Sequence, residues 1–201
     1  MPAFKERTVE RFRDKLKGGG TRPNLFEVVI NTPPMLDKKV VDADVMKFMI
    51  KAAEVPAANI GNIPVPFRGR VLPVAGDRTF DPWTVTVIND LEGNVKNVRN
   101  FMEVWSNSIN DLEFDGGVTN PASYQAIAKV FQFGRTAGAQ KELKDGQGGS
   151  GKYKVLRAYE FFGIYPNSVS AIPLDYGATD QIEEFQVTFN YLYWDITKPT
   201  T

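Results

Sequence analysis

The sequence contains no cysteine and no histidine. Without them it can form neither a disulfide framework nor a thiolate or imidazole metal site. Catalytic triads that need a histidine base or a cysteine nucleophile are excluded for the same reason. The 24 basic and 24 acidic residues cancel, so the chain lacks the basic footprint of a dedicated nucleic-acid-binding protein. These absences predict a protein that is not an enzyme and carries no metal or cofactor.

Long hydrophobic runs are also missing. No stretch approaches the 18 apolar residues that would predict a transmembrane helix. The opening segment MPAFKERTVERFRDKLK lacks the apolar core of a signal peptide, so we expect assembly in the cytoplasm of the cell that makes the protein. With 201 residues, of which 42% are hydrophobic, we expect a single domain, residues 1–201, with a substantial core.

Signatures of nucleotide and carboxylate sites are weak. The segment GQGGSG, residues 146–151, resembles a phosphate-binding loop only in its glycine content, because no Lys-Ser or Lys-Thr follows it. Asp175, Asp180, Glu183 and Glu184 resemble the paired carboxylates of glycosidases, but carboxylates close in sequence are typical of solvated turns. A hard cation suits them better than glycoside chemistry, although their spacing matches no EF-hand loop.

Charge is unevenly distributed along the chain. Residues 1–17 carry six basic and three acidic side chains, whereas residues 166–197 carry five acidic side chains and no lysine or arginine. Such asymmetry can align the copies of an assembly. Solvated surface charge is the alternative interpretation.

The N-terminal segment has the pattern of a short amphipathic helix over residues 3–17. Phe4, Phe12 and Leu16 lie on one apolar face, and Gly18, Gly19 and Gly20 end the pattern. A helix this short does not hide its apolar face alone. We therefore interpret residues 1–20 as a docking segment that packs either on its own domain or on a neighbouring copy.

Most of the remaining pattern predicts strands. Period-two alternation or β-branched and aromatic enrichment marks the segments 24–31, 45–52, 79–89, 153–164 and 182–196. The segment 123–132 is ambiguous between helix and strand, but its alternation favours a strand. Four prolines between Pro56 and Pro73 predict an extended connector with an edge strand over residues 70–74. A polar excursion is expected over residues 35–44, and a flexible hairpin tip over residues 145–151.

One internal helix is expected, opened by Gly93 and Asn94 and extending over residues 95–108, with an apolar stripe that covers a sheet. The expected core comprises Trp83, Val85, Phe101, Trp105, Phe185 and Phe189. Uncharged polar side chains occupy the other face of the same strands, namely Thr84, Thr86, Gln186, Thr188 and Asn190. The pattern predicts a mainly β (α+β) fold: two packed antiparallel sheets, or a partly open β-barrel, with one packed helix.

Three blocks of the sequence are more specific. They are RPNLFEV (residues 22–28), PVPFRGRVLPVAGDRTFDPWTVTVIND (residues 64–90) and the segment 161–194, which contains IEEFQVTFNYLYW. In order and spacing these blocks resemble the tail tube proteins of T-even-like bacteriophages with contractile tails. The pair Ile164–Tyr165 departs from the family pattern, which often has an aliphatic residue followed by tryptophan.

The resemblance implies a structural protein of the virion. Copies would form hexameric rings with a continuous inner barrel, and the rings would stack helically into a tube inside a contractile sheath. The implied partners are further copies, the tail sheath protein, the tape-measure protein, the baseplate initiator and the tail terminator. Phage DNA would pass through the lumen without sequence-specific binding.

In such a tube the polar face of these strands would either line the lumen or face solvent elsewhere. Docking between subunits or rings is assigned to Phe4, Phe12, Leu16, Lys38, Lys39 and Gln147. Two related alternatives stay open: a baseplate tube-initiator paralogue, and the tube of a phage-like contractile injection system. A small β-rich enzyme or sugar-binding module is a different class, and the sequence offers no convergent polar cluster to support it.

Overall fold

The computed structural model describes residues 9–16, 20–36, 49–90, 97–110, 117, 120–135 and 155–197. The helices are α1 (Val9–Lys15), α3 (Val98–Ile109) and α4 (Pro121–Tyr124). The strands are β1 (Phe26–Ile30), β2 (Ile50–Ala53), β3 (Asn59–Phe67), β4 (Arg70–Thr79), β5 (Trp83–Ile88), β6 (Ala126–Phe133), β7 (Val155–Val169), β8 (Glu184–Asn190) and β9 (Tyr193–Thr197).

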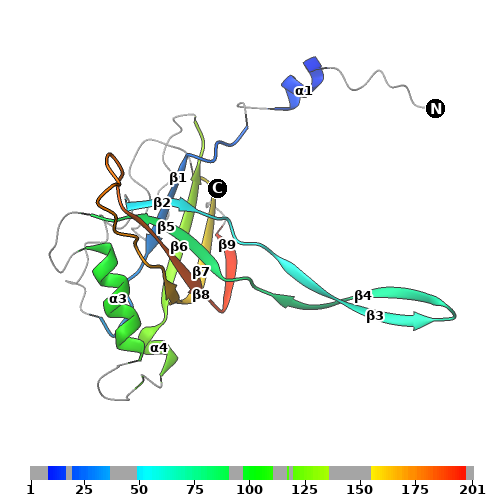
Figure 1. Ribbon diagram of the computed structural model, residues 1–201. Coiled ribbons are helices and arrows are strands. Elements are labelled where there is room, and N and C mark those ends of the chain that lie inside the picture. The colour runs from blue at the N-terminus through cyan, green and yellow to red at the C-terminus, as the bar shows by residue number, and fades with distance from the viewer. Residues whose placement is uncertain are drawn as a thin grey trace.

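The strands of the body pair in the order β1-β6-β7-β8-β5-β2. β9 lies off this path and pairs with residues 158–162 of β7, whereas β8 pairs with residues 165–169. Every pairing is antiparallel. The long strand β7 therefore belongs to two groups of strands, one with β1, β6 and β9 and the other with β8, β5 and β2 (Figure 1). The mainly β architecture of antiparallel sheets with few helices is confirmed.

A bend in β7 separates these two groups. Gly163 lies at the bend with a φ of 67°, a conformation that favours glycine because it has no Cβ. Before the bend β7 pairs with β9, and after it β7 pairs with β8. The chain opposite is interrupted at Leu192, whose backbone N–H donates to the carbonyl oxygen of Phe162 at 3.0 Å. The expectation of one strand over residues 182–196 is therefore wrong, because β8 ends at Asn190 and β9 begins at Tyr193, opposite the register irregularity at Gly163.

The core lies on one face of β5 and β8, under α3. Trp83, Val85, Phe185 and Phe189 alternate with more exposed residues along the two strands. The ring of Trp83 stacks on Phe161 at 4.5 Å between centroids. From the helix, Phe101 and Trp105 are fully buried, and the Trp105 ring lies 6.1 Å from that of Phe189. All six expected core side chains are thus buried in one cluster.

Local signals explain how α3 is placed. Asn97 caps the helix, because its side-chain oxygen accepts a hydrogen bond from the backbone N–H of Arg99 at 2.7 Å. The expected opening by Gly93 and Asn94 is wrong: the cap lies at Asn97, and residues 91–96 lie outside the described part of the chain. The indole N–H of Trp105 donates to the carbonyl oxygen of Tyr124 at 2.8 Å, which ties α3 to α4.

Three other expectations need correction. The segment 123–132 does not begin as a strand: Pro121–Tyr124 forms α4, capped by Asn120, and β6 begins at Ala126. The second expected strand begins at Ile50 in the described chain. The proline-rich connector is a β-hairpin of two long strands, β3 and β4. Of the excursion expected over residues 35–44, residues 37–44 lie outside the described residues, and so does the glycine-rich tip at residues 145–151.

Candidate assembly surfaces

The hairpin β3–β4 forms a separate two-stranded sheet that extends away from the body (Figure 1). Its turn is made by Arg68 and Gly69, both with positive φ, 45° and 79°. Positive φ at both central residues defines a type I′ turn, whose twist matches that of the flanking strands. The dipeptide Arg68–Gly69 therefore sets the register in which Phe67 lies opposite Arg70.

Prolines fit this hairpin because of the register. A two-residue turn makes Phe67 and Arg70 a hydrogen-bonded pair, and such pairs alternate with non-hydrogen-bonded ones along an antiparallel ladder. Pro64 lies opposite Pro73, and Pro66 lies opposite Val71. All three prolines thus occupy non-hydrogen-bonded positions, where the missing N–H would point away from the partner strand. The four prolines that predicted an extended connector are therefore compatible with a two-stranded hairpin.

One face of the hairpin is apolar and exposed. Three cross-strand pairs share this face: Ile63 with Val74, Val65 with Leu72, and Phe67 with Arg70. Phe67 is 66% exposed and Leu72 is 59% exposed. A two-stranded ribbon is marginally stable on its own, and a contiguous exposed apolar surface marks an interaction site. This face was not predicted from the sequence, although the apolar runs on both sides of an Arg-Gly turn were a usable signal.

The base of the hairpin is fixed to the body by tryptophan side chains. The Trp83 indole N–H donates to the carbonyl oxygen of Glu54 at 2.9 Å, and that of Trp194 donates to the carbonyl oxygen of Ala57 at 3.1 Å. The Asn59 amide, at the start of β3, donates to the carboxylate of Asp81. These contacts hold the entry and exit of the hairpin, so its direction relative to the body is defined where it leaves the sheet.

Tyr191 lies near the same base. Its ring meets Phe80 at 5.8 Å and Phe161 at 5.1 Å between centroids. Partial burial, and secondarily the negative charge of Asp81, raise the pKa of the Tyr191 hydroxyl above its ordinary value. The phenol therefore remains neutral at physiological pH and acts as an aromatic packing group.

A second surface is the polar face of β5 and β8, opposite the core. The strand register places Thr84 opposite Thr188 and Thr86 opposite Gln186. The hydroxyl oxygens of Thr84 and Thr188 lie 3.2 Å apart. Asn190 ends the row and donates to the hydroxyl oxygen of Tyr165 at 3.4 Å. The five side chains suggested for the lumen therefore lie on one continuous sheet face, which is half-exposed to exposed.

A third surface is formed by α1 and Leu16, the residue that follows it, where three apolar side chains are exposed to solvent. Val9, Phe12 and Leu16 are 84%, 67% and 44% exposed. Phe12 and Leu16 thus lie together on an uncovered helix face, as two of the suggested docking residues. The other four suggested docking residues, Phe4, Lys38, Lys39 and Gln147, lie outside the described residues.

Two absences hold for the described residues. None of their helices is long and apolar enough to cross a membrane. They contain no cluster of three or more carboxylates that would suit a metal ion.

Comparisons of structure first define the class. The fold is similar to a chain of the anti-feeding prophage baseplate, with a TM-score of 0.57 at 9% identity, over 90% of this chain and 98% of that one. It is also similar to a chain of the PVC sheath-tube complex of an extracellular contractile injection system. That match has a TM-score of 0.52 at 10% identity, over 95% of this chain and 98% of that one. At these identities the likeness shows a shared fold, that of components of contractile injection assemblies.

Sequence then gives the family. The pattern of the family described as phage tail tube protein matches residues 21–197. The tail tube protein gp19 of Enterobacteria phage T4 is 34% identical over 179 residues, which cover 89% of this chain and 93% of gp19. The tail tube protein of Serratia phage KSP90 is 28% identical over 92% of this chain and 94% of that relative. The chain belongs to the phage tail tube protein family, a structural family of the virion rather than a family of enzymes.

Proposed function

We propose that this chain polymerises as hexameric rings that stack helically, and that the resulting tube is the conduit for DNA ejection inside a contractile sheath. The observation that carries the proposal is the free-standing hairpin β3–β4, whose apolar face is exposed in the isolated subunit. A family of tube proteins needs surfaces that remain uncovered until a neighbouring copy arrives. Family membership and this surface support self-assembly as the function.

Ring closure is best supported at strand edges. β2, β1 and β9 each lie at an edge of the strand path or beside it. An open edge presents unpaired N–H and C=O groups that a neighbouring strand can bind. The contact must be heterologous, one edge meeting a different edge of the next copy, because only such contacts close into rings of more than two. A chain of the anti-feeding prophage baseplate has a similar fold, and that baseplate was solved with six-fold symmetry.

The polar face of β5 and β8 is our candidate for the lumen wall. Gln186 is exposed and Thr84, Thr86, Thr188 and Asn190 are half-exposed, and none of the five is charged. These five side chains offer no cation that would trap phosphates by counterion release. Asn190→Lys is expected to slow DNA passage, measured as reduced infectivity of phage particles that carry normal tails. Unchanged infectivity of those particles argues for a face that points away from the lumen.

The N-terminal segment is our candidate for docking between rings. Its apolar side chains Val9, Phe12 and Leu16 are exposed, and they would be removed from water only by packing against another surface. Removal of residues 1–17 is expected to impair tube growth more than subunit folding. A truncated protein that polymerises at the wild-type rate would show that the segment has no part in docking.

The outer partners are proposed on family grounds: the tail sheath protein, the tape-measure protein, the baseplate initiator and the tail terminator. Solved assemblies with the same fold include a sheath-tube complex and a sheath/tube terminator. The test of the main proposal is negative-stain electron microscopy of the purified protein, alone and with purified baseplates. Hollow tubes support it, and monomers under both conditions contradict it. A baseplate tube initiator is distinguished by its low copy number per particle.

A further inference from the structure

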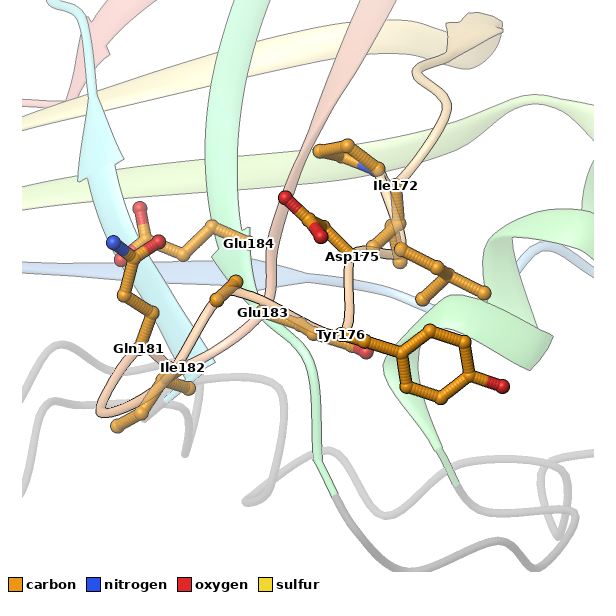
Figure 2. A pocket seen from close by; sticks show the side chains of 10 residues that line it. Ile172, Asp175, Tyr176, Gln181, Ile182, Glu183 and Glu184 are labelled. Atoms are coloured by element: carbon orange, nitrogen blue, oxygen red, sulfur yellow. The ribbon is translucent and has the colours of Figure 1, made fainter.

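The loop between β7 and β8 forms a hollow of about 880 Å³ on the body of the subunit. Side chains from both limbs of the loop line it (Figure 2). Leu174, Tyr176 and Ile182 contribute apolar surface that is 82%, 109% and 70% exposed. An uncovered apolar surface of this kind around a concave site is typical of a binding site for another macromolecule.

The hollow is also acidic. Asp175, Glu183 and Glu184 line it, Asp180 belongs to the same loop, and no lysine or arginine occurs from residue 166 to 197. Lys51 pairs with Glu184 at 2.6 Å, and the Asn89 amide donates to Glu183 at 2.8 Å. These contacts use two carboxylates but add only one positive charge, so the site keeps a net negative charge.

The tip of the β3–β4 hairpin has the complementary chemistry. Arg68 lies in the turn and Arg70 follows it, and residues 59–76 contain no acidic side chain. The Arg68 guanidinium lies over the Phe67 ring, 5.3 Å from its centroid. The tip thus presents an exposed aromatic ring between two cations, whereas the hollow presents exposed apolar side chains among carboxylates. Opposite charges on facing surfaces set orientation and suppress wrong contacts.

Position allows this contact only between copies. The hairpin tip extends from one side of the body, and the loop after β7 lies on the other side (Figure 1). A nine-residue strand spans about 30 Å, so the tip reaches well beyond its own subunit. Because the tip and the hollow are different surfaces at opposite ends, the contact is heterologous and repeats from copy to copy.

We infer that the hairpin tip, with Phe67, Arg68 and Arg70, seats in the acidic hollow of a neighbouring copy. This inference rests on the proposed function, since it names the receiving surface for the hairpin. The occupant of the hollow is then a second copy of this chain rather than a metal ion or a small molecule.

Cross-linking tests the pairing directly, because the natural chain has no cysteine to interfere. One protein carries Arg70→Cys and a second carries Ala178→Cys, in the lining of the hollow. When the two are mixed under assembly conditions and oxidised, we expect a disulfide-linked heterodimer. The control mixes Arg70→Cys with Arg157→Cys, an exposed position on β7 outside the hollow. Equal cross-linking in the two mixtures, or none in the first, overturns the inference.

Charge reversal gives an independent readout. Arg68→Glu/Arg70→Glu places like charges against the hollow and is expected to raise the concentration needed for tube growth by about tenfold or more. Combination with Asp175→Arg/Glu183→Arg is expected to restore growth. If the wild type forms tubes and the Arg68→Glu/Arg70→Glu protein assembles equally well, this inference is contradicted. The proposed function is then unaffected. Failure of the wild-type protein to form tubes on baseplates contradicts the proposed function itself.

Discussion

At the scale of the residue, Gly163 shows how one side chain controls the corner between the two groups of strands. Its φ is positive, and a Cβ at this position would lie 2.7 Å from Cδ1 of Leu192 and 3.2 Å from Oε1 of Gln125. Alanine would therefore be strained in its backbone and would displace Leu192. Composition and alternation do not reveal this, because the close approach depends on a residue that is distant in sequence.

Gly163→Ala is expected to lower the free energy of unfolding by roughly 1–2 kcal/mol through left-handed backbone strain, with a smaller addition from the displacement of Leu192. Leu192 is 59% exposed, so Leu192→Ala alone should cost little. In the double variant the collision is removed and part of the loss should be recovered. Denaturant unfolding of the wild type, the two single variants and the double variant measures this. If Gly163→Ala lowers the free energy of unfolding equally in the wild-type and the Leu192→Ala backgrounds, the collision is refuted.

Tyr191 gives a pH dependence of known sign. Because its pKa is raised in the folded protein above the ordinary 10.0, the folded state binds the phenolic proton more tightly than the unfolded state. This contribution to stability is complete below pH 10 and is lost as the pH rises through the folded pKa. Between pH 9 and pH 11, roughly, we expect the wild type to lose more stability than Tyr191→Phe. Parallel losses in the two proteins would contradict the assignment.

At the scale of the element, α3 and the hairpin differ in how far the sequence predicts them. The apolar stripe of α3, with Phe101 and Trp105, follows from helical periodicity, and the structure buries it. The hairpin was misinterpreted because four prolines between Pro56 and Pro73 argue against a central strand. Proline restricts a strand only where its N–H is needed, and that depends on the register set by the turn at Arg68 and Gly69.

The hairpin also allows a prediction about stability. β3 and β4 pair only with each other in the described chain. Replacing residues 64–73 with Asn-Gly keeps the flanking pair Ile63 and Val74 and should change the free energy of unfolding by less than about 0.5 kcal/mol. Phe189→Ala, in the core, should cost about 3–5 kcal/mol in the same denaturant experiment. A comparable loss for the shortened hairpin would show that it supports the body. Tube growth of the shortened protein should be abolished.

At the scale of the whole molecule, the mainly β fold and the family were predictable, since the blocks around GDRTF and IEEFQVTFNYLYW extend over much of the chain. The assembly surfaces were predictable only in part. Phe12 and Leu16 are exposed as a docking role requires. The apolar face of the hairpin and the hollow of the β7–β8 loop were not predicted, because each depends on side chains that pair across strands or fold back within a loop.

The central claim is that copies of this chain form stacked hexameric rings. Cryo-electron microscopy of tubes that the purified protein forms on baseplates tests this claim most directly. We expect a hollow tube with six subunits per ring. Particles that remain monomeric on baseplates, or filaments without a continuous channel, would contradict it.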